Sequence, residues 1–153
     1  PAIKHGDAVV TETGAICAYL ADAFPQAGLA PAPGDMQRGP YYRWMYYAAG
    51  CVEPAAWLGA MKFEPPVDRR RMVGYGTMGE VLDALEGAVS QGEFILGDKF
   101  SAADVYLGSQ IGWGVQFGTL EKRPAFEAYL GRIMGRPAAA RARGIDDALI
   151  PKN

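Results

Sequence analysis

Apolar residues recur at helical spacing along most of this chain, and only the first ten residues have the apolar runs and turn cluster of strands. Each apolar stripe buries one face of a helix against its neighbours, so a series of such stripes favours a helical bundle. Pro54 lies deep within the apolar pattern of residues 36–62 and should kink or split the helix expected there. We expect helices over residues 36–62, 66–91, 101–117 and 124–135, then a short last helix from Pro137 with a loose tail after Gly144. The sequence therefore predicts a mainly α fold.

The first 35 residues divide into a hairpin, a helix and a linker. Apolar runs around a turn-forming cluster predict two antiparallel strands over residues 1–10. A helix follows over residues 11–24, with Thr11 as its N-cap. Because a lone hairpin is marginally stable in water, we expect further strands upstream of Pro1 to lie beside it. Proline, glycine and alanine then dominate, as in a semi-rigid linker. We therefore expect one unit over residues 1–24, a linker over 25–35 and a helical domain over 36–153.

The charge balance argues against nucleic acid or an anionic membrane as a partner. The chain has 15 basic and 17 acidic side chains, a net charge of −2, whereas proteins that bind nucleic acid are basic. No apolar run has the 18 or so residues that a membrane span needs. Cys17 and Cys51 lie far apart without further ligands, so we expect neither a disulfide nor a metal site. Reduced thiols favour the cytoplasm.

The segment Thr11–Leu20 passes directly from an apolar strand into a helix. A helix start presents unpaired backbone N–H groups and the positive end of the helix dipole, and both favour an anionic ligand. Glu12 and Thr13 lie in this first turn and are candidate ligand-binding residues. The alternative is that they are ordinary residues of a helix start.

Ser101 and Asp104 have the spacing of a capping box, in which each side chain bonds to the other residue's backbone N–H group. A catalytic role for this serine would require a base within reach. His5 is the single histidine and lies in the predicted turn. We therefore expect a structural role for both residues.

Two segments together resemble the glutathione S-transferase family, of the bacterial type. Glu12-Thr13-Gly14-Ala15-Ile16 resembles the family's Glu/Gln-Ser-x-Ala-Ile segment, with threonine in place of serine. The segment Gly97–Asp104 matches the family's Gly-Asp-x-apolar-Ser-x-Ala-Asp element, in the family's order along the chain. The stretch Arg43–Gly50 also resembles the first long helix of the helical domain in bacterial members, and Arg136–Ala138 resembles the start of their last helix.

This resemblance implies a glutathione transferase C-terminal-type helical bundle, preceded by the last hairpin and helix of a thioredoxin-like domain. It implies that glutathione is the co-substrate, with its γ-glutamyl end held by Glu12 and Thr13. Pro1-Ala2-Ile3 looks like the family's Val-Pro-Ala-Leu segment. The serine, tyrosine or cysteine that activates the glutathione sulfur is therefore expected upstream of Pro1. We expect this chain alone to lack a catalytic residue and to be inactive.

An apolar second substrate needs a pocket, and aromatic residues crowd the helix expected over residues 36–62. Tyr42, Met45 and Tyr46, together with Trp113 on a later helix, are candidates to line an electrophile pocket. The alternative for the first three is ordinary core or dimer surface. Members of the family are usually homodimers, which implies a homodimer here.

Three functions stay open at the level of sequence. The first is nucleophilic addition of glutathione to small electrophiles, as the resemblance implies. The second is a non-catalytic binding or assembly domain of the same type. The third is an isomerase or reductive dehalogenase of the same family.

Overall fold

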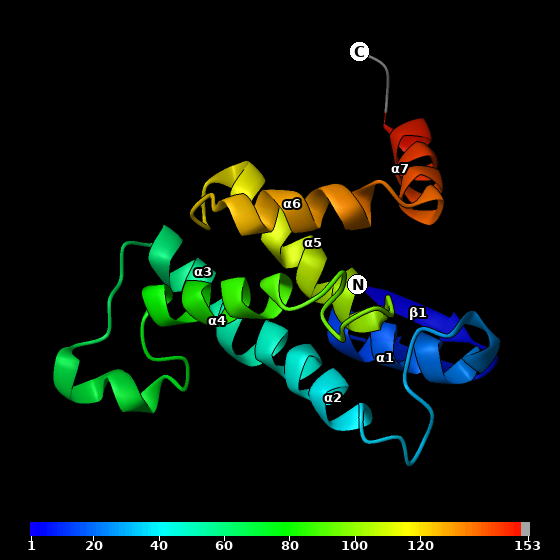
Figure 1. Cartoon of the computed structure of the whole chain (residues 1–153), viewed down its shortest axis with the longest axis horizontal. Coiled ribbons are helices and arrows are strands. Elements are labelled where there is room, and N and C mark those ends of the chain that lie inside the picture. The colour runs from blue at the N-terminus through cyan, green and yellow to red at the C-terminus, as the bar shows by residue number, and fades with distance from the viewer. Residues whose placement is uncertain (151–153) are drawn as a thin grey trace.

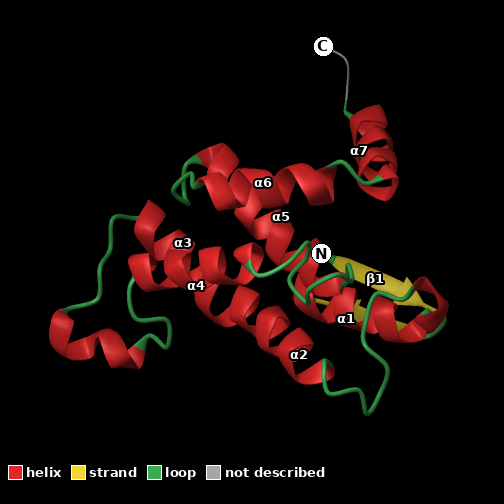
Figure 2. Cartoon of the chain, viewed as in Figure 1, coloured by secondary structure: helices red, strands yellow, loops and turns green. Residues whose placement is uncertain are grey.

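A computed structural model describes residues 1–150 of the chain (Figure 1). Figure 2 shows helices throughout, apart from one hairpin at the N-terminus, so the prediction of a mainly α fold is confirmed. The strands are β1 (Ala2–His5) and β2 (Ala8–Thr11). The helices are α1 (Thr13–Ala23), α2 (Arg38–Tyr47), α3 (Glu53–Ala60), α4 (Met78–Ser90), α5 (Ala102–Phe117), α6 (Pro124–Met134) and α7 (Pro137–Leu149). Three shorter turns join them: the 3-10 turns η1 (Pro25–Ala27) and η3 (Val67–Met72), and the π-turn η2 (Ala48–Val52).

Strands β1 and β2 pair antiparallel, with Ile3 opposite Val10. Gly6 takes the left-handed conformation that the tight turn requires (φ 59°). The chain then enters α1 almost without a loop, because Thr11 ends β2 and Thr13 begins the helix. The prediction of Thr11 as N-cap was wrong, since Glu12 holds that position and no side chain caps the helix.

Helices α2 and α3 form one continuous stretch interrupted by the π-turn η2. The interruption lies directly before Pro54, which enters the first turn of α3. Proline has no N–H group and its ring crowds the preceding turn, so a regular helix could not continue through it. A π-turn is one way to absorb such a defect without breaking the helix. The sequence predicted a kink or a break at this proline, and in the structure the helix is interrupted by a π-turn directly before it.

The prediction of a single helix over residues 66–91 was wrong. The chain instead forms η3, then a loop with left-handed Gly74 and Gly76 (φ 76° and 75°), then α4. Thr77 starts α4 with a capping box, because its Oγ accepts from Glu80 N at 3.2 Å and Glu80 Oε2 accepts from Thr77 N at 2.8 Å. The segment between α3 and α4 projects at the left of Figure 1.

Helix α5 lies at the centre and packs against α1, α2 and α6. Its small residues allow this: a methyl group at Gly108 would overlap Ile133 of α6. The largest fully buried side chains come from most of the helices and form one core: Tyr41, Val52, Val81, Leu85, Leu107, Ile111, Phe126 and Tyr129.

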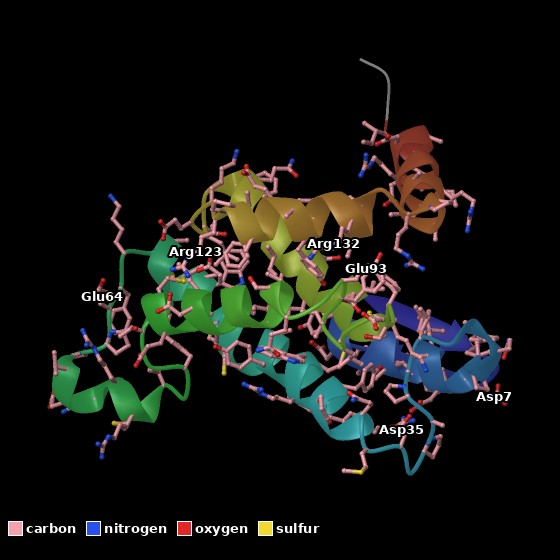
Figure 3. All side chains as sticks on the ribbon, viewed as in Figure 1. Asp7, Asp35, Glu64, Glu93, Arg123 and Arg132 are labelled. Carbon is pink, nitrogen blue, oxygen red and sulfur yellow. The ribbon has the colours of Figure 1, made fainter. Side chains whose placement is uncertain are left out.

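Two arginines fasten α6 to α4 (Figure 3). At one end Arg123 Nη1 contacts Asp83 Oδ1 at 2.8 Å and Glu86 Oε2 at 2.7 Å. At the other end Arg132 donates to the carbonyl oxygens of Val89 and Glu93, at 3.3 and 2.9 Å. The second contact places a cation at the C-terminus of α4, where the helix dipole favours it.

Arg38 at the start of α2 joins three segments. Its guanidinium donates to both carboxylate oxygens of Asp22 on α1 at 2.6 Å, and to the carbonyl of Pro31 at 2.7 Å. Its Nε donates to Tyr42 Oη at 2.8 Å. The backbone N–H of Ala102 donates to Leu29 O at 2.7 Å, so the stretch between η1 and α2 is also held against the start of α5.

The last helix is longer than expected. The chain is helical to Leu149, so the prediction of a loose tail after Gly144 was wrong. Helix α7 contacts α6 but has no buried residue, and it stands apart from the other helices in Figure 1.

Within residues 1–150, no helix combines the length and apolar character needed to cross a membrane. Cys17 and Cys51 are free thiols. The same part of the chain has no cluster of three or more His, Cys, Asp or Glu side chains placed to hold a metal ion.

Candidate functional site

The start of α1 is exposed and uncapped. Glu12 has a left-handed φ of 68° with ψ 125°, and no side chain accepts from the first N–H groups of the helix. A non-glycine residue in this region is uncommon and costs conformational energy. Glu12 and Thr13 are both exposed to solvent. The turn from β2 into α1 therefore presents an acid, a hydroxyl and unpaired N–H groups on the surface.

Tyr106 of α5 lies directly against this helix start. A Cβ built on Gly14 would lie 2.9 Å from Tyr106 Cε1, so only glycine fits there without a shift of the ring. Burial raises the pKa of Tyr106, and the negative charge of Glu53, a hydrogen bond to the Glu53 carboxylate and, more weakly, the charge of Glu12 contribute further. Tyr106 thus lies between the start of α1 and the start of α3.

A cavity of about 480 Å³ lies between α3 and the C-terminal half of α5. One wall comes from η2 and α3, the other from α5, and the loop after α5 closes one end. It is lined mainly by apolar and aromatic side chains: Val52, Glu53, Ala56, Trp57, Gln110, Trp113, Gly114, Phe117, Thr119 and Leu120.

Helical geometry explains which residues line this cavity. Gln110, Trp113, Gly114 and Phe117 are spaced three and four residues apart and so share one face of α5. Trp113 stacks on Phe117 with ring centroids 5.1 Å apart, and each side chain is 64% exposed. On the opposite wall Trp57 is also 64% exposed. Three large aromatic surfaces therefore line one cavity.

The candidate pocket residues lie in different places. Trp113 lines the cavity, whereas Tyr42, Met45 and Tyr46 of α2 are not among its lining residues. Met45 is buried in the core at 5% exposure, while Tyr42 and Tyr46 are 41% and 75% exposed on the outer face of α2.

Ser101 and Asp104 form a buried capping box at the start of α5. Asp104 Oδ2 accepts from Ser101 N at 2.9 Å, and Ser101 Oγ accepts from Ala103 N at 3.3 Å. Both side chains are almost fully buried. Cys17 is partly buried, and burial raises its pKa, which keeps the thiol protonated.

Sequence reasoning missed Glu53, Trp57 and Gln110 as residues of the cavity. The spacing of Gln110 from Trp113 was visible in the sequence. The position of Trp57 opposite Trp113 was not, because it depends on how α3 packs beside α5.

Comparisons with known proteins agree on one family. The model described as "Glutathione S-transferase, C-terminal domain" matches residues 56–137, more than half of the chain. Protein LigF of Sphingobium sp. is 28% identical over 90% of this chain and 70% of its own length. A glutathione S-transferase of Hyoscyamus muticus is 26% identical over 93% of this chain and 72% of its own length.

Solved structures give the same result. A glutathione transferase of Methylococcus capsulatus has a TM-score of 0.77 and 29% identity over 97% of this chain and 74% of its own. A sphingomonad glutathione S-transferase, solved in complex with glutathione, has a TM-score of 0.74 and 28% identity over 98% of this chain and 74% of its own. The match to the family model and the shared fold lead to one conclusion: this chain belongs to the glutathione S-transferase family.

Proposed function

We propose that this protein is a glutathione transferase that binds the γ-glutamyl end of glutathione at the start of α1 and an apolar electrophile in the cavity between α3 and α5. One observation carries the proposal: the start of α1 is exposed and uncapped, with Glu12 and Thr13 at its tip. Such a helix start binds a carboxylate through its N–H groups and dipole.

The two residues take complementary parts of the ligand. The hydroxyl and N–H of Thr13 donate to the carboxylate of the γ-glutamyl group. The Glu12 carboxylate accepts from its ammonium, and hydrogen bonds between charged groups are the stronger kind. The two opposite charges of an amino acid head group thus meet matching groups at one helix start. In this proposal residues 1–24 carry the anchor and residues 36–153 the electrophile cavity, with 25–35 as the linker.

The spacing of the two sites fits a tripeptide. Tyr106, which touches Gly14, and Trp113, which lines the cavity, are seven residues apart on α5, so they are separated by roughly 10 Å along the helix axis. An extended chain of three residues spans about 10 Å. A tripeptide anchored at Thr13 can therefore direct its thiol toward the cavity, and holding two reactants together in this way removes part of the barrier to their reaction.

The side chain that activates the sulfur is proposed to come from upstream of Pro1. Ser101 is buried in its capping box, and the pKa of Cys17 is raised rather than lowered. Neither residue is therefore suited to stabilise a thiolate. The two free thiols support a reducing compartment, the cytoplasm.

Calorimetric titration with glutathione tests the anchor. Thr13→Ala should weaken binding by about tenfold or more, because it removes a hydrogen bond to a charged group. Thr13→Ser should retain the affinity of the parent chain. Thr11→Ala, at the exposed end of β2, is the matched control and should leave it unchanged. Equal affinities for Thr13→Ala and the parent chain would remove the assigned role.

An activity assay separates the remaining functions. With glutathione and a chlorinated dinitrobenzene we expect no turnover from this chain alone. Turnover at a normal rate would show that a residue of this chain activates the sulfur. Glutathione binding without turnover, in a version extended upstream of Pro1, would favour the non-catalytic binding or assembly domain.

The outer face of α2 supports a homodimer. Tyr42 and Tyr46 are exposed there, and tyrosine is enriched in protein interfaces. Sedimentation should show a dimer for the parent chain and more monomer for Tyr46→Glu. An unchanged dimer in that variant would place the interface elsewhere.

A further inference from the structure

Glu53 is a carboxylate on the wall of a mainly apolar and aromatic cavity, whose other polar lining residues are the uncharged Gln110 and Thr119. It is the one acidic or basic side chain among the lining residues, and it forms no ion pair with any residue of 1–150. Other carboxylates of the chain form ion pairs: Asp22 with Arg38, and Asp83 and Glu86 with Arg123. Glu53 therefore lines the cavity without a neutralising cation among residues 1–150, and its carboxylate interacts there with the uncharged Tyr106.

The surroundings of Glu53 favour a positive ligand. Trp57 from the same helix and Trp113 with Phe117 from the opposite wall offer aromatic surfaces, each 64% exposed. Aromatic faces attract cations through their quadrupole, tryptophan most strongly, and quaternary ammonium ligands are recognised in this way. A carboxylate beside such rings adds a full negative charge.

A simpler explanation for an acid at this place is the start of α3, where it interacts with the helix dipole. That explanation does not require the side chain to lie on the cavity wall. The π-turn η2 before Pro54 sets the direction of the first turn of α3, and it places Glu53 with Val52, Ala56 and Trp57 on the cavity side. π-turns of this kind are frequent at functional sites.

We propose that the cavity between α3 and α5 selects aromatic electrophiles that carry a protonated or quaternary amine, with Glu53 as the residue that determines this specificity. The inference rests on the proposed function for the location of the electrophile. It adds the charge class of the substrate, which an apolar pocket alone would not specify.

Three small probes of similar size test it: phenyltrimethylammonium, its uncharged isostere tert-butylbenzene, and the neutral hydrogen-bond donor 4-tert-butylphenol. Their binding to the purified chain is measured by ligand-observed NMR. Tryptophan emission reports the location, because Trp57 and Trp113 line the cavity and the third tryptophan, Trp44, is buried in the core.

We expect the ammonium to bind most tightly of the three. Glu53→Gln should weaken the ammonium by about three- to fivefold and leave tert-butylbenzene within about 1.5-fold, because the substitution removes the charge and keeps the aromatic rings. Glu93→Gln is the matched control: Glu93 follows α4, its side chain is exposed, and it makes no ion pair within residues 1–150, so the same change in net charge should leave all three affinities unchanged.

Each other outcome overturns a defined part of the proposal. Equal binding of the ammonium to the parent chain and to Glu53→Gln would remove Glu53 as the selecting residue while the apolar pocket stands. Tightest binding of the phenol, lost in Glu53→Gln, would replace the cation by a hydroxyl donor. Failure of all three probes would show that the cavity takes no such ligand. That result would leave the glutathione anchor intact, since calorimetry tests it separately.

Discussion

The hydroxyl of Tyr129 donates to Asp104 Oδ1 at 2.9 Å and so joins the middle of α6 to the first turn of α5. The same oxygen accepts from Ile95 N at 2.8 Å, and Oδ2 accepts from the N–H and hydroxyl of Ser101 at 2.9 and 3.1 Å. Asp104 is fully buried, and a buried charge is tolerated when hydrogen bonds surround it. One carboxylate therefore ties α5, α6 and the loop that contains Ile95.

Tyr129→Phe tests this junction. The variant keeps the ring but removes one of the four hydrogen bonds to a buried carboxylate. We expect the free energy of unfolding in urea to fall by about 1.5–3 kcal/mol. Tyr46→Phe is the control, because Tyr46 is 75% exposed, and it should change stability by less than about 0.5 kcal/mol. Equal stability of the two variants would contradict the role of this bond.

The capping box of α4 gives a second prediction. Thr77→Ala removes the acceptor for Glu80 N, so the free energy of unfolding should fall by about 1 kcal/mol. Thr77→Ser keeps a hydroxyl at the same place and should recover most of the loss. Urea unfolding of both variants measures the difference. If serine were no better than alanine, the cap would contribute nothing.

The start of α4 illustrates which parts of the fold could be predicted from the sequence and which could not. Apolar spacing identified α1 and α6 within about two residues, because each has a stripe and a proline or glycine at an end, and the capping box at Ser101 located the start of α5. The stripe over 66–91 suggested one helix, yet Gly74 and Gly76 take left-handed conformations that end it. The Thr-x-x-Glu pattern at Thr77 was present in the sequence, and it is the signal that marks the true start of α4.

The candidate site likewise has one part that the local sequence predicts and another part that depends on how the helices pack. The exposed helix start that carries Glu12 and Thr13 could be predicted because strand, turn and helix are adjacent in sequence, whereas the binding role of the two residues stays a prediction. The cavity depends on the packing of α3 beside α5, more than forty residues apart along the chain. No local pattern indicates that Trp57 faces Trp113. Glu53 is brought to the cavity by a π-turn, whose geometry the sequence signals only through Pro54.

Two glycines in helices should respond oppositely to alanine. A methyl group at Gly108 would overlap Ile133, so Gly108→Ala should destabilise the protein by about 1–3 kcal/mol through overpacking. Nothing lies within 4 Å of a Cβ at Gly87 on the exposed side of α4. Gly87→Ala should therefore stabilise the protein by up to about 1 kcal/mol through helix propensity. Thermal unfolding of the pair measures both signs, and a loss of stability in both would contradict the packing described for α4.

Tyr41 provides a prediction on pH. Its side chain is fully buried, and its hydroxyl has no hydrogen-bond partner within residues 1–150. Burial, with the negative charge of Asp22 as the second cause, raises the pKa of Tyr41 from 10 to about 12. The folded state therefore holds this proton more tightly than the unfolded state does. The resulting stability is complete below pH 10 and is lost as the pH rises from 10 to 12.

Tyr41→Phe should be neutral or slightly stabilising at pH 7, because it removes a buried hydroxyl that lacks a partner. Between pH 10 and 12 the free energy of unfolding should fall by roughly 2 kcal/mol less in the variant than in the parent chain. A further fall remains in both proteins, because burial and the neighbouring Asp104 also raise the pKa of Tyr129, and burial raises the pKa values of Tyr47 and Tyr106. Urea unfolding at pH 7, 10, 11 and 12 measures the two curves, with Tyr46→Phe as the exposed control. Parallel curves for Tyr41→Phe and the parent chain would show that Tyr41 ionises in the folded protein as easily as in the unfolded chain.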